Sequence, residues 1–348
     1  MGMNPNANLI DVMKTLTFGV EIETLGANRK ALAEAVATAF PGSRVDYEGG
    51  SYDKWAVTLE DGRKWTVVSD ASITGGRGAY NNGEVVTPIC TWADLEAIQA
   101  AIRAIRTIAH ARVDSSCGIH VHIGTPADRF DAAALTRLAK LTYQQEPLIF
   151  AALGVGNVRR ERYTRPVDEA FIRRLAVSRP GSRDTLASAW YGEGSYIHTR
   201  SYAQTQHYHE SRYHGLNLHS VFYRGTAEFR YFESTLHAGQ VKAYVQFCLA
   251  LAAKALTATG AMARKRDFNP ATAKYDFRVF LLRIGLIGPE FKTARLHLMA
   301  KLQGSAAWRH GRPTPVPATP APSAPDAAPA ADAAAQGPTG ETEPTEGA

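Results

Sequence analysis

The sequence contains little cysteine, and its cysteines do not cluster. Cys90, Cys117 and Cys248 are scattered over 348 residues, and no CxxC pair occurs. This pattern excludes a disulfide scaffold and a cysteine-based zinc site, and it is typical of a reducing compartment. We therefore expect a cytoplasmic protein whose cysteines are small buried apolar residues.

The sequence also lacks a recognisable membrane segment. Residues 1–14 contain no apolar leader core, and Asn6 stands where a myristoylation motif needs serine or threonine. The most apolar long run, at 239–263, contains Lys242 and Lys254, so we expect it to form a buried helix. No membrane partner is therefore expected.

Large apolar side chains are missing from the last part of the chain. Residues 311–348 are rich in proline and alanine, and no large apolar residue follows Val316. Such a segment cannot bury enough surface to offset its chain entropy, so we expect a disordered tail. The tail is acidic although the whole chain has a net charge of +6, so the remaining body is strongly basic. A basic body suggests anionic partners, such as phosphates, acidic substrates or nucleic acid.

The body alternates short extended runs with helical ones. Asp61-Gly62 separates two extended runs as in a hairpin, and Gly225 separates the runs 215–224 and 226–235 in the same way. Single strands with helices between hairpins predict an α+β fold, with an antiparallel sheet and helices packed on one face. The expected helices are 28–40, 92–112, 131–150, 239–263 and about 289–302.

Four of the extended runs place polar groups on one face and apolar residues on the other. Because side chains alternate along a strand, the two glutamates of FGVEIE share a face, as do the two histidines of GIHVHIG. The same spacing places Glu228 and Arg230 together, and Glu84 opens a run that follows Asp70. If these strands are neighbours, their polar faces form one floor.

Carboxylates gathered on one face would repel one another and raise one another's pKa values unless a cation lay between them. Oxygen ligands with an added imidazole favour Mg²⁺ or Mn²⁺. Divalent ions beside an arginine are recurring parts of phosphoryl transfer. The glycine-rich loop at 75–83 does not have the residue order of a P-loop. The candidate metal ligands are Glu21, Glu23, Glu84, His120, Glu228 and Asp70.

Several motifs, in this order, resemble the amidoligase family. They are FGVEIE, WTVVSDASI, GEVVTP, CGIHVHIG, and YHGLNL followed by GTAEFRYFEST, and they span roughly residues 15–260. That family belongs to the carboxylate–amine ligase superfamily, with glutamine synthetase and glutamate–cysteine ligase. The resemblance implies a glutamine synthetase-like catalytic fold with a curved antiparallel sheet. The implied catalytic domain is 15–310, between an N-terminal extension at 1–14 and the tail at 311–348.

The resemblance also implies ATP-dependent amide formation through an acyl phosphate, with small-molecule or peptide carboxylates and amines as substrates. His120 would be a metal ligand, and His122 and Arg230 would act as catalytic residues beside the nucleotide phosphates. Only one clear glutamate, Glu84, stands where glutamine synthetase has a close pair. The further expected nucleotide-binding residues are Asn217 and Arg212, and Glu193 is a candidate general base.

Two other functions compete with this interpretation. A metal-dependent hydrolase could use the HxH strand, as barrel amidohydrolases do, but their HxH lies on the first strand and regular strand–helix repeats follow. A nucleic-acid-binding module would use the basic body, but it leaves the acidic strands unexplained. We therefore expect ATP and Mg²⁺ or Mn²⁺ as cofactors and no nucleic-acid partner, and the sequence predicts no oligomeric state.

Overall fold

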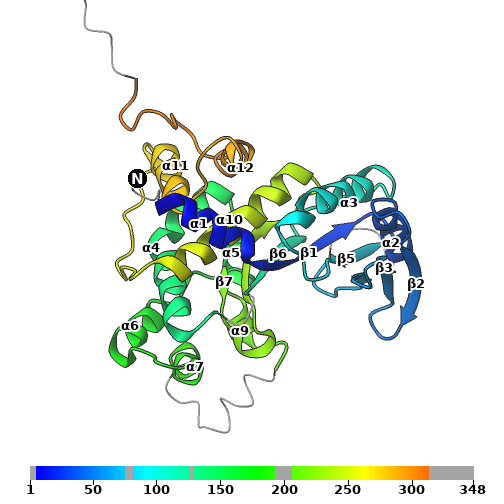
Figure 1. Ribbon diagram of the computed structural model, residues 1–348, viewed down its shortest axis with the longest axis horizontal. Coiled ribbons are helices and arrows are strands. Elements are labelled where there is room, and N and C mark those ends of the chain that lie inside the picture. The colour runs from blue at the N-terminus through cyan, green and yellow to red at the C-terminus, as the bar shows by residue number, and fades with distance from the viewer. Residues whose placement is uncertain (1–4, 75–80, 126–128, 193–205, 313–348) are drawn as a thin grey trace, which may run out of the picture. The chain divides into compact units, whose positions relative to one another are not determined.

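The computed structural model describes residues 5–74, 81–125, 129–192 and 206–312 (Figure 1). Residues 1–311 form one compact unit and residues 312–348 a second one. All helices and strands named below belong to the first unit. Residues 313–348 of the predicted disordered tail, Glu193 and residues 75–80 of the glycine-rich loop lie outside the described residues.

One sheet of eight strands organises the described chain. Its strand order is β2-β3-β4-β5-β1-β6-β8-β7, and neighbouring strands are antiparallel throughout. The predicted mixed fold with a large antiparallel sheet and helices is therefore confirmed. The strands are β1 (Thr17–Leu25), β2 (Arg44–Gly49), β3 (Lys54–Thr58), β4 (Lys64–Val68), β5 (Asn82–Val86), β6 (Gly118–Gly124), β7 (Leu216–Asn217) and β8 (Ala227–Glu233).

The two central strands, β1 and β6, separate an apolar face from a polar one. Val20 and Ile22 of β1 and Val121 of β6 are fully buried, whereas the residues between them carry carboxylates and imidazoles. Helix α10 (Ala238–Thr257) packs against both strands, and α2 (Arg29–Ala37) packs against β2, β3, β4 and β5. The sheet therefore buries its branched residues under helices and leaves the other side chains of β1 and β6 for a site.

Local signals explain where several elements begin and turn. Gly62, at the predicted hairpin between β3 and β4, has a φ of +82°, which glycine adopts at little cost. Asn28 and Asp131 cap the predicted helices that follow them, because each side chain accepts a backbone N–H of the first turn. The remaining helices are α1 (Pro5–Thr15), α3 (Leu95–Thr107), α4 (Ala132–Leu153), α5 (Asn157–Arg162), α6 (Glu169–Ser178), α7 (Arg183–Tyr191), α9 (His219–Arg224), α11 (Ala273–Arg283) and α12 (Lys292–Leu298).

The hairpin predicted around Gly225 is confirmed only in part: β7 pairs antiparallel with β8, but most of the first predicted strand is not a strand. Only Leu216 and Asn217 form a strand before it, and residues 219–224 form the short helix α9. The branched and aromatic residues of this segment favour a strand, but its buried side chains do not alternate. Asn217 accepts the N–H of Ser220 at 3.4 Å, and Gly225 closes the helix with a φ of +81°. The side chain of Asn217 before the segment and Gly225 after it therefore favour a helix, in spite of the strand propensity of the residues between them.

The segment at 1–14 contributes to the packed body. From Pro5 on it forms α1, which contacts α10, and its Leu9 and Met13 are buried in the core.

A buried carboxylate connects α4 to the inner side of β8. Glu146 is 1% exposed and accepts hydrogen bonds from the N–H of Val167 at 3.0 Å and the hydroxyl of Tyr231 at 2.7 Å. Burial, the largest effect, raises the pKa of Glu146 from 4.5 to about 7. The folded protein therefore holds this proton at pH values where the unfolded chain releases it.

Glu146→Gln is expected to remove part of the pH dependence of stability. Because the pKa of Glu146 is higher in the folded state, Glu146 adds to the free energy of unfolding. This contribution is complete below about pH 4.5 and is lost as the pH rises through about 7. The shift corresponds to about 3 kcal/mol between pH 4 and pH 8. The free energy of unfolding is measured in urea at both pH values. Between pH 4 and pH 8 it should fall by about 3 kcal/mol more in the wild type than in the variant. Exposed Glu169→Gln is the control, and an equal pH dependence in wild type and Glu146→Gln would contradict the prediction.

Candidate active site

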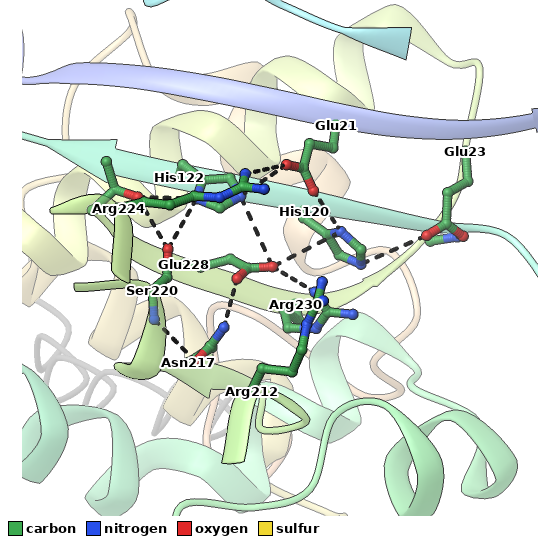
Figure 2. A network of polar contacts seen from close by, with 12 residues as sticks. Glu21, Glu23, His120, His122, Arg212, Asn217, Ser220, Arg224, Glu228 and Arg230 are labelled. Carbon is green, nitrogen blue, oxygen red and sulfur yellow. Dashed lines mark hydrogen bonds and ion pairs between the residues drawn. The ribbon is translucent and has the colours of Figure 1, made fainter. Parts of the chain in front are cut away.

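Strand register brings the predicted polar residues into one row. Across the β1–β5 pair, Glu23 lies opposite Glu84, and across the β1–β6 pair, Glu21 lies opposite His120. Across the β6–β8 pair, His122 lies opposite Glu228. Motifs separated by about two hundred residues therefore share one floor. Figure 2 shows the side chains of Glu21, His120 and Glu228 converging on its centre.

The centre of this cluster is His120, which is 4% exposed. Its Nδ1 lies 3.0 Å from Oε2 of Glu21, and its Nε2 lies 3.8 Å from Oε1 of Glu23. The second histidine, His122, has Nε2 3.3 Å from Oε1 of Glu21 and Nδ1 3.0 Å from the hydroxyl of Thr226. Each imidazole therefore contacts a carboxylate of β1.

Glu228 is held from two sides. Arg230 donates from Nη1 to Oε1 of Glu228 at 2.6 Å, and Asn217 donates from Nδ2 to Oε2 at 2.6 Å (Figure 2). All three side chains are at most 4% exposed. A charge-assisted pair of this kind fixes the carboxylate against rotation. Asn217, predicted as a nucleotide-binding residue, therefore contacts Glu228 directly.

The carboxylates of the site have unequal pKa values. Burial, followed by the charge of Glu21, raises the pKa of Glu84 well above its usual value, and burial raises that of Glu23 to about 7. Burial would also raise the pKa of Glu21, but His122 and His120 together hold it well below its usual value. For Glu228 burial is likewise outweighed, chiefly by Arg230, so that its pKa falls to about 2.

The two histidines differ in the same way. Burial and the charge of Arg230 lower the pKa of His120 to about 4, so this imidazole is neutral at pH 7 and keeps a lone pair. The pKa of His122 is raised, because Glu21 and Glu228 outweigh the effect of burial. His122 therefore carries positive charge more readily than a free histidine.

The donor set fits a hard divalent cation. Two groups have ligand atoms within 4.8 Å of one another, Glu21–His120–Glu228 and Glu23–Glu84–His120. Carboxylate oxygens with one imidazole suit Mg²⁺ or Mn²⁺ better than a soft metal. Both groups use His120, whose neutral ring has a single lone pair, so only one ion at a time can take that imidazole. Asp70, the sixth predicted ligand, belongs to neither group.

A cavity of about 550 Å³ opens beside this cluster. Asp70 lies in its wall, where its Oδ1 accepts the N–H of Ser72 at 2.7 Å. Arg212 also lines the cavity, and its guanidinium stands over the rings of Tyr208 and Tyr213 at 5.4 and 5.8 Å. His122 and Asn217 line a smaller adjoining hollow instead. The predicted residues therefore divide between a wide cavity and the hollow next to it.

Several residues of the site have no distinctive sequence signal. Arg224, at the end of α9, donates from Nη1 to Oε1 of Glu21 at 3.2 Å, and its Nη2 lies 2.8 Å from Nε2 of His207. Arg159 of α5 is buried in the cavity wall, although its neighbours Arg160 and Arg162 are exposed. The one sequence clue to Arg224 is that it directly precedes the Gly225-Thr226 motif.

Comparison with known proteins decides the family. The model of the family described as "Putative amidoligase enzyme" matches residues 14–252, which is more than half of the chain. The chain belongs to the amidoligase family. The matched segment contains every strand of the sheet and every residue of the polar row, so the predicted resemblance is confirmed. The description of this family names an amidoligase, which is an enzyme of the ligase class.

Among solved structures, the amidoligase chain is similar to a bifunctional glutathione synthetase from Pasteurella multocida, with 12% identity and a TM-score of 0.40. The match covers 87% of this chain and 49% of the other, so the chain spans about half the length of that protein. No curated protein matches the sequence. In the described part of the chain, no helix has the length and apolar composition needed to cross a membrane.

Proposed function

We propose that this amidoligase is an ATP-dependent carboxylate–amine ligase that forms an amide bond through an acyl phosphate. One observation carries the proposal: the family motifs place four carboxylates and two imidazoles in one row, with a buried arginine beside a cavity of about 550 Å³. A carboxylate needs activation before an amine can attack it, and phosphorylation supplies the leaving group. The cavity and its charges suit that chemistry.

The proposal includes the scaffold and the cofactors. We assign the sheet to a glutamine synthetase-like catalytic domain at 15–310 and ATP with Mg²⁺ or Mn²⁺ as cofactors. Glu21, Glu23, Glu84, His120 and Glu228 would hold the ions, with Asp70 in the adjacent wall. When bound, the cations would neutralise phosphate charge and so allow two anionic substrates to approach.

The chain's own residues would then orient and stabilise the phosphoryl group. Arg230 is 4% exposed and lines the cavity, and its pairing with Glu228 fixes the direction of its guanidinium. A preoriented guanidinium stabilises charge that develops during transfer without reorganising. His122, whose pKa is raised, adds positive charge beside Glu21, and Arg212 adds a cation on the cavity wall. Glu193 stays a proposal for the general base.

The alternative of a barrel metal hydrolase finds no support in the scaffold. Such barrels consist of parallel strands, whereas the sheet of the described residues is antiparallel throughout. In addition, His120 and His122 do not form one ligand group, since only His120 belongs to the candidate groups. A ligase uses the acidic strands that this alternative leaves without a role.

The proposed function is tested by ADP release. Full-length protein with ATP and Mg²⁺ or Mn²⁺ is incubated with pools of amino acids and peptides, and ADP is measured with and without an added amine. We expect substrate-dependent ADP formation together with a product whose mass equals acid plus amine minus water. Amide hydrolysis without nucleotide would contradict the ligase and indicate the hydrolase. Steeply salt-dependent binding of DNA or RNA without any ADP release would instead favour the nucleic-acid-binding module.

A further inference from the structure

Arg159 is a buried cation of the cavity wall that has no carboxylate within 4.0 Å among the described residues. Its side chain is 6% exposed, yet it lines the cavity of about 550 Å³. It comes from the short helix α5, and none of the family motifs contains it. Arginine is rarely buried to this degree unless it is paired, so its surroundings indicate whether its role is structural.

The contacts of Arg159 are few and long for a group with five N–H donors. Nη1 lies 3.5 Å from the carbonyl oxygen of Cys117, and Nη2 lies 3.4 Å from the carbonyl oxygen of Arg230. Both distances exceed the usual range for N–H···O hydrogen bonds. Nε has no hydrogen-bond partner, and among the described residues no carboxylate oxygen lies within 4.0 Å of the guanidinium.

The fold makes room for this guanidinium instead of filling the space with apolar side chains. A Cβ at Gly118 would overlap Nη1 and Nη2 of Arg159, so a larger residue where β6 begins would displace the guanidinium from this position. The same Gly118 donates its N–H to Oε2 of Glu23 at 2.6 Å. Arg159 is therefore held at the edge of the acidic row, where a ligand that contacts Glu23 through a cation would also reach it.

A second guanidinium lies close by. The backbone of Arg230 contacts Arg159, and the Arg230 guanidinium stands 5.9 Å over the ring of Tyr213, which in turn packs against Tyr163. Arg159 and Arg230 repel each other electrostatically, and Arg230 alone has a carboxylate within ion-pairing distance among the described residues. Glu23 and Glu233 attract the Arg159 guanidinium only from beyond ion-pairing distance, so no carboxylate among the described residues takes up its N–H donors, and these remain for a ligand oxyanion.

We propose that Arg159 binds an oxyanion of the ligand, either a carboxylate of the acid substrate that does not react or a phosphoryl oxygen of the nucleotide. The inference deepens the proposed function, since it adds a specificity-determining residue to the same cavity. An arginine fork matches both kinds of oxyanion through paired N–H donors. If the anion is a carboxylate, the acid substrate carries at least two carboxylates, one to react and one to be held.

The test measures anion binding without turnover, in full-length protein with Mg²⁺ present and ATP absent. Thermal unfolding and titration calorimetry are run with glutarate, inorganic phosphate, and butyrate as a monocarboxylate control, at constant ionic strength. The variants are Arg159→Met, Arg159→Lys and Arg162→Met, the last on the exposed side of the same helix. We expect at least one dianion to raise the Tm of the wild type and of Arg162→Met. Arg159→Met should weaken that binding at least about tenfold, as loss of a charge-assisted hydrogen bond predicts.

Stability gives an independent readout. Because burial disfavours the charge of Arg159 and no carboxylate of the described residues lies within 4.0 Å of it, Arg159→Met is expected to keep or raise the Tm without anion. A response to glutarate alone identifies the substrate carboxylate, and a response to phosphate alone identifies the phosphoryl group. A lowered Tm with an unchanged anion response would overturn the proposal, as would a wild type that responds to neither dianion. Failure of ADP release would leave this result intact, so the two proposals fail separately.

Discussion

Glu228→Gln is expected to reduce ADP formation by about 10²–10³-fold and to destabilise the protein. Glu228 pairs with Arg230 at 2.6 Å, and both side chains are 4% exposed. Removing one partner leaves the other charge buried and uncompensated, which costs about 3–5 kcal/mol. The loss of activity has a separate cause, since Arg230 would no longer be oriented towards the transferred group. Urea unfolding and an ADP-release assay measure the two effects on the same preparation.

A double variant separates these two effects. Glu228→Gln combined with Arg230→Met removes both charges and should recover most of the stability while activity stays low. Glu161→Gln, an exposed substitution on α5, is the control for charge alone and should match the wild type in both assays. Wild-type ADP formation in Glu228→Gln would remove Glu228 and Arg230 from the catalytic assignment.

Glu84→Gln is expected to have opposite effects on stability with and without metal. Burial and the charges of Glu21 and Asp70 raise the pKa of Glu84, so its ionisation is unfavourable in the folded state. A group with a raised pKa destabilises the folded state once the pH is high enough to ionise it, and glutamine cannot ionise. At pH 8 in chelator the variant should therefore be more stable than the wild type. Added Mn²⁺ should stabilise the wild type by about 2.7 kcal/mol at a hundred times its Kd.

In the variant this metal-dependent stabilisation should be much smaller, because one of the two candidate ligand groups has lost a carboxylate. Thermal unfolding at pH 8 with EDTA, Mg²⁺ or Mn²⁺ gives the comparison. Glu60→Gln, an exposed substitution just after β3, is the control. A full Mn²⁺ response in Glu84→Gln would exclude Glu84 as a ligand and leave Glu21, His120 and Glu228 as the remaining group.

Alternation within each strand made the polar row predictable from the sequence. Glu21 with Glu23 and His120 with His122 need only the rule that side chains two residues apart share a face. The hairpin at Gly62 and the capped starts of α2 and α4 follow from equally local chemistry. Local chemistry therefore accounts for the acidic and imidazole groups of the candidate site.

Features that depend on tertiary contacts were not predictable in this way. Arg159 has the same local sequence character as exposed Arg160, and only its packing against Gly118 distinguishes them. The segment at 219–224 favours a strand by composition, but Asn217 and Gly225 close it as a helix. Burial of Glu146 likewise depends on Tyr231, which is 85 residues away.

The ion pair between Arg224 and Glu21 affects how any cation enters the site. The guanidinium lies 3.2 Å from Oε1 of Glu21, so a cation that binds this oxygen would compete with Arg224 for it. The observed affinity for the ion is then the intrinsic affinity reduced by the strength of the resident pair. A cation that displaced Arg224 from Glu21 would leave the guanidinium charge in the cavity wall, where an incoming polyanion would meet it.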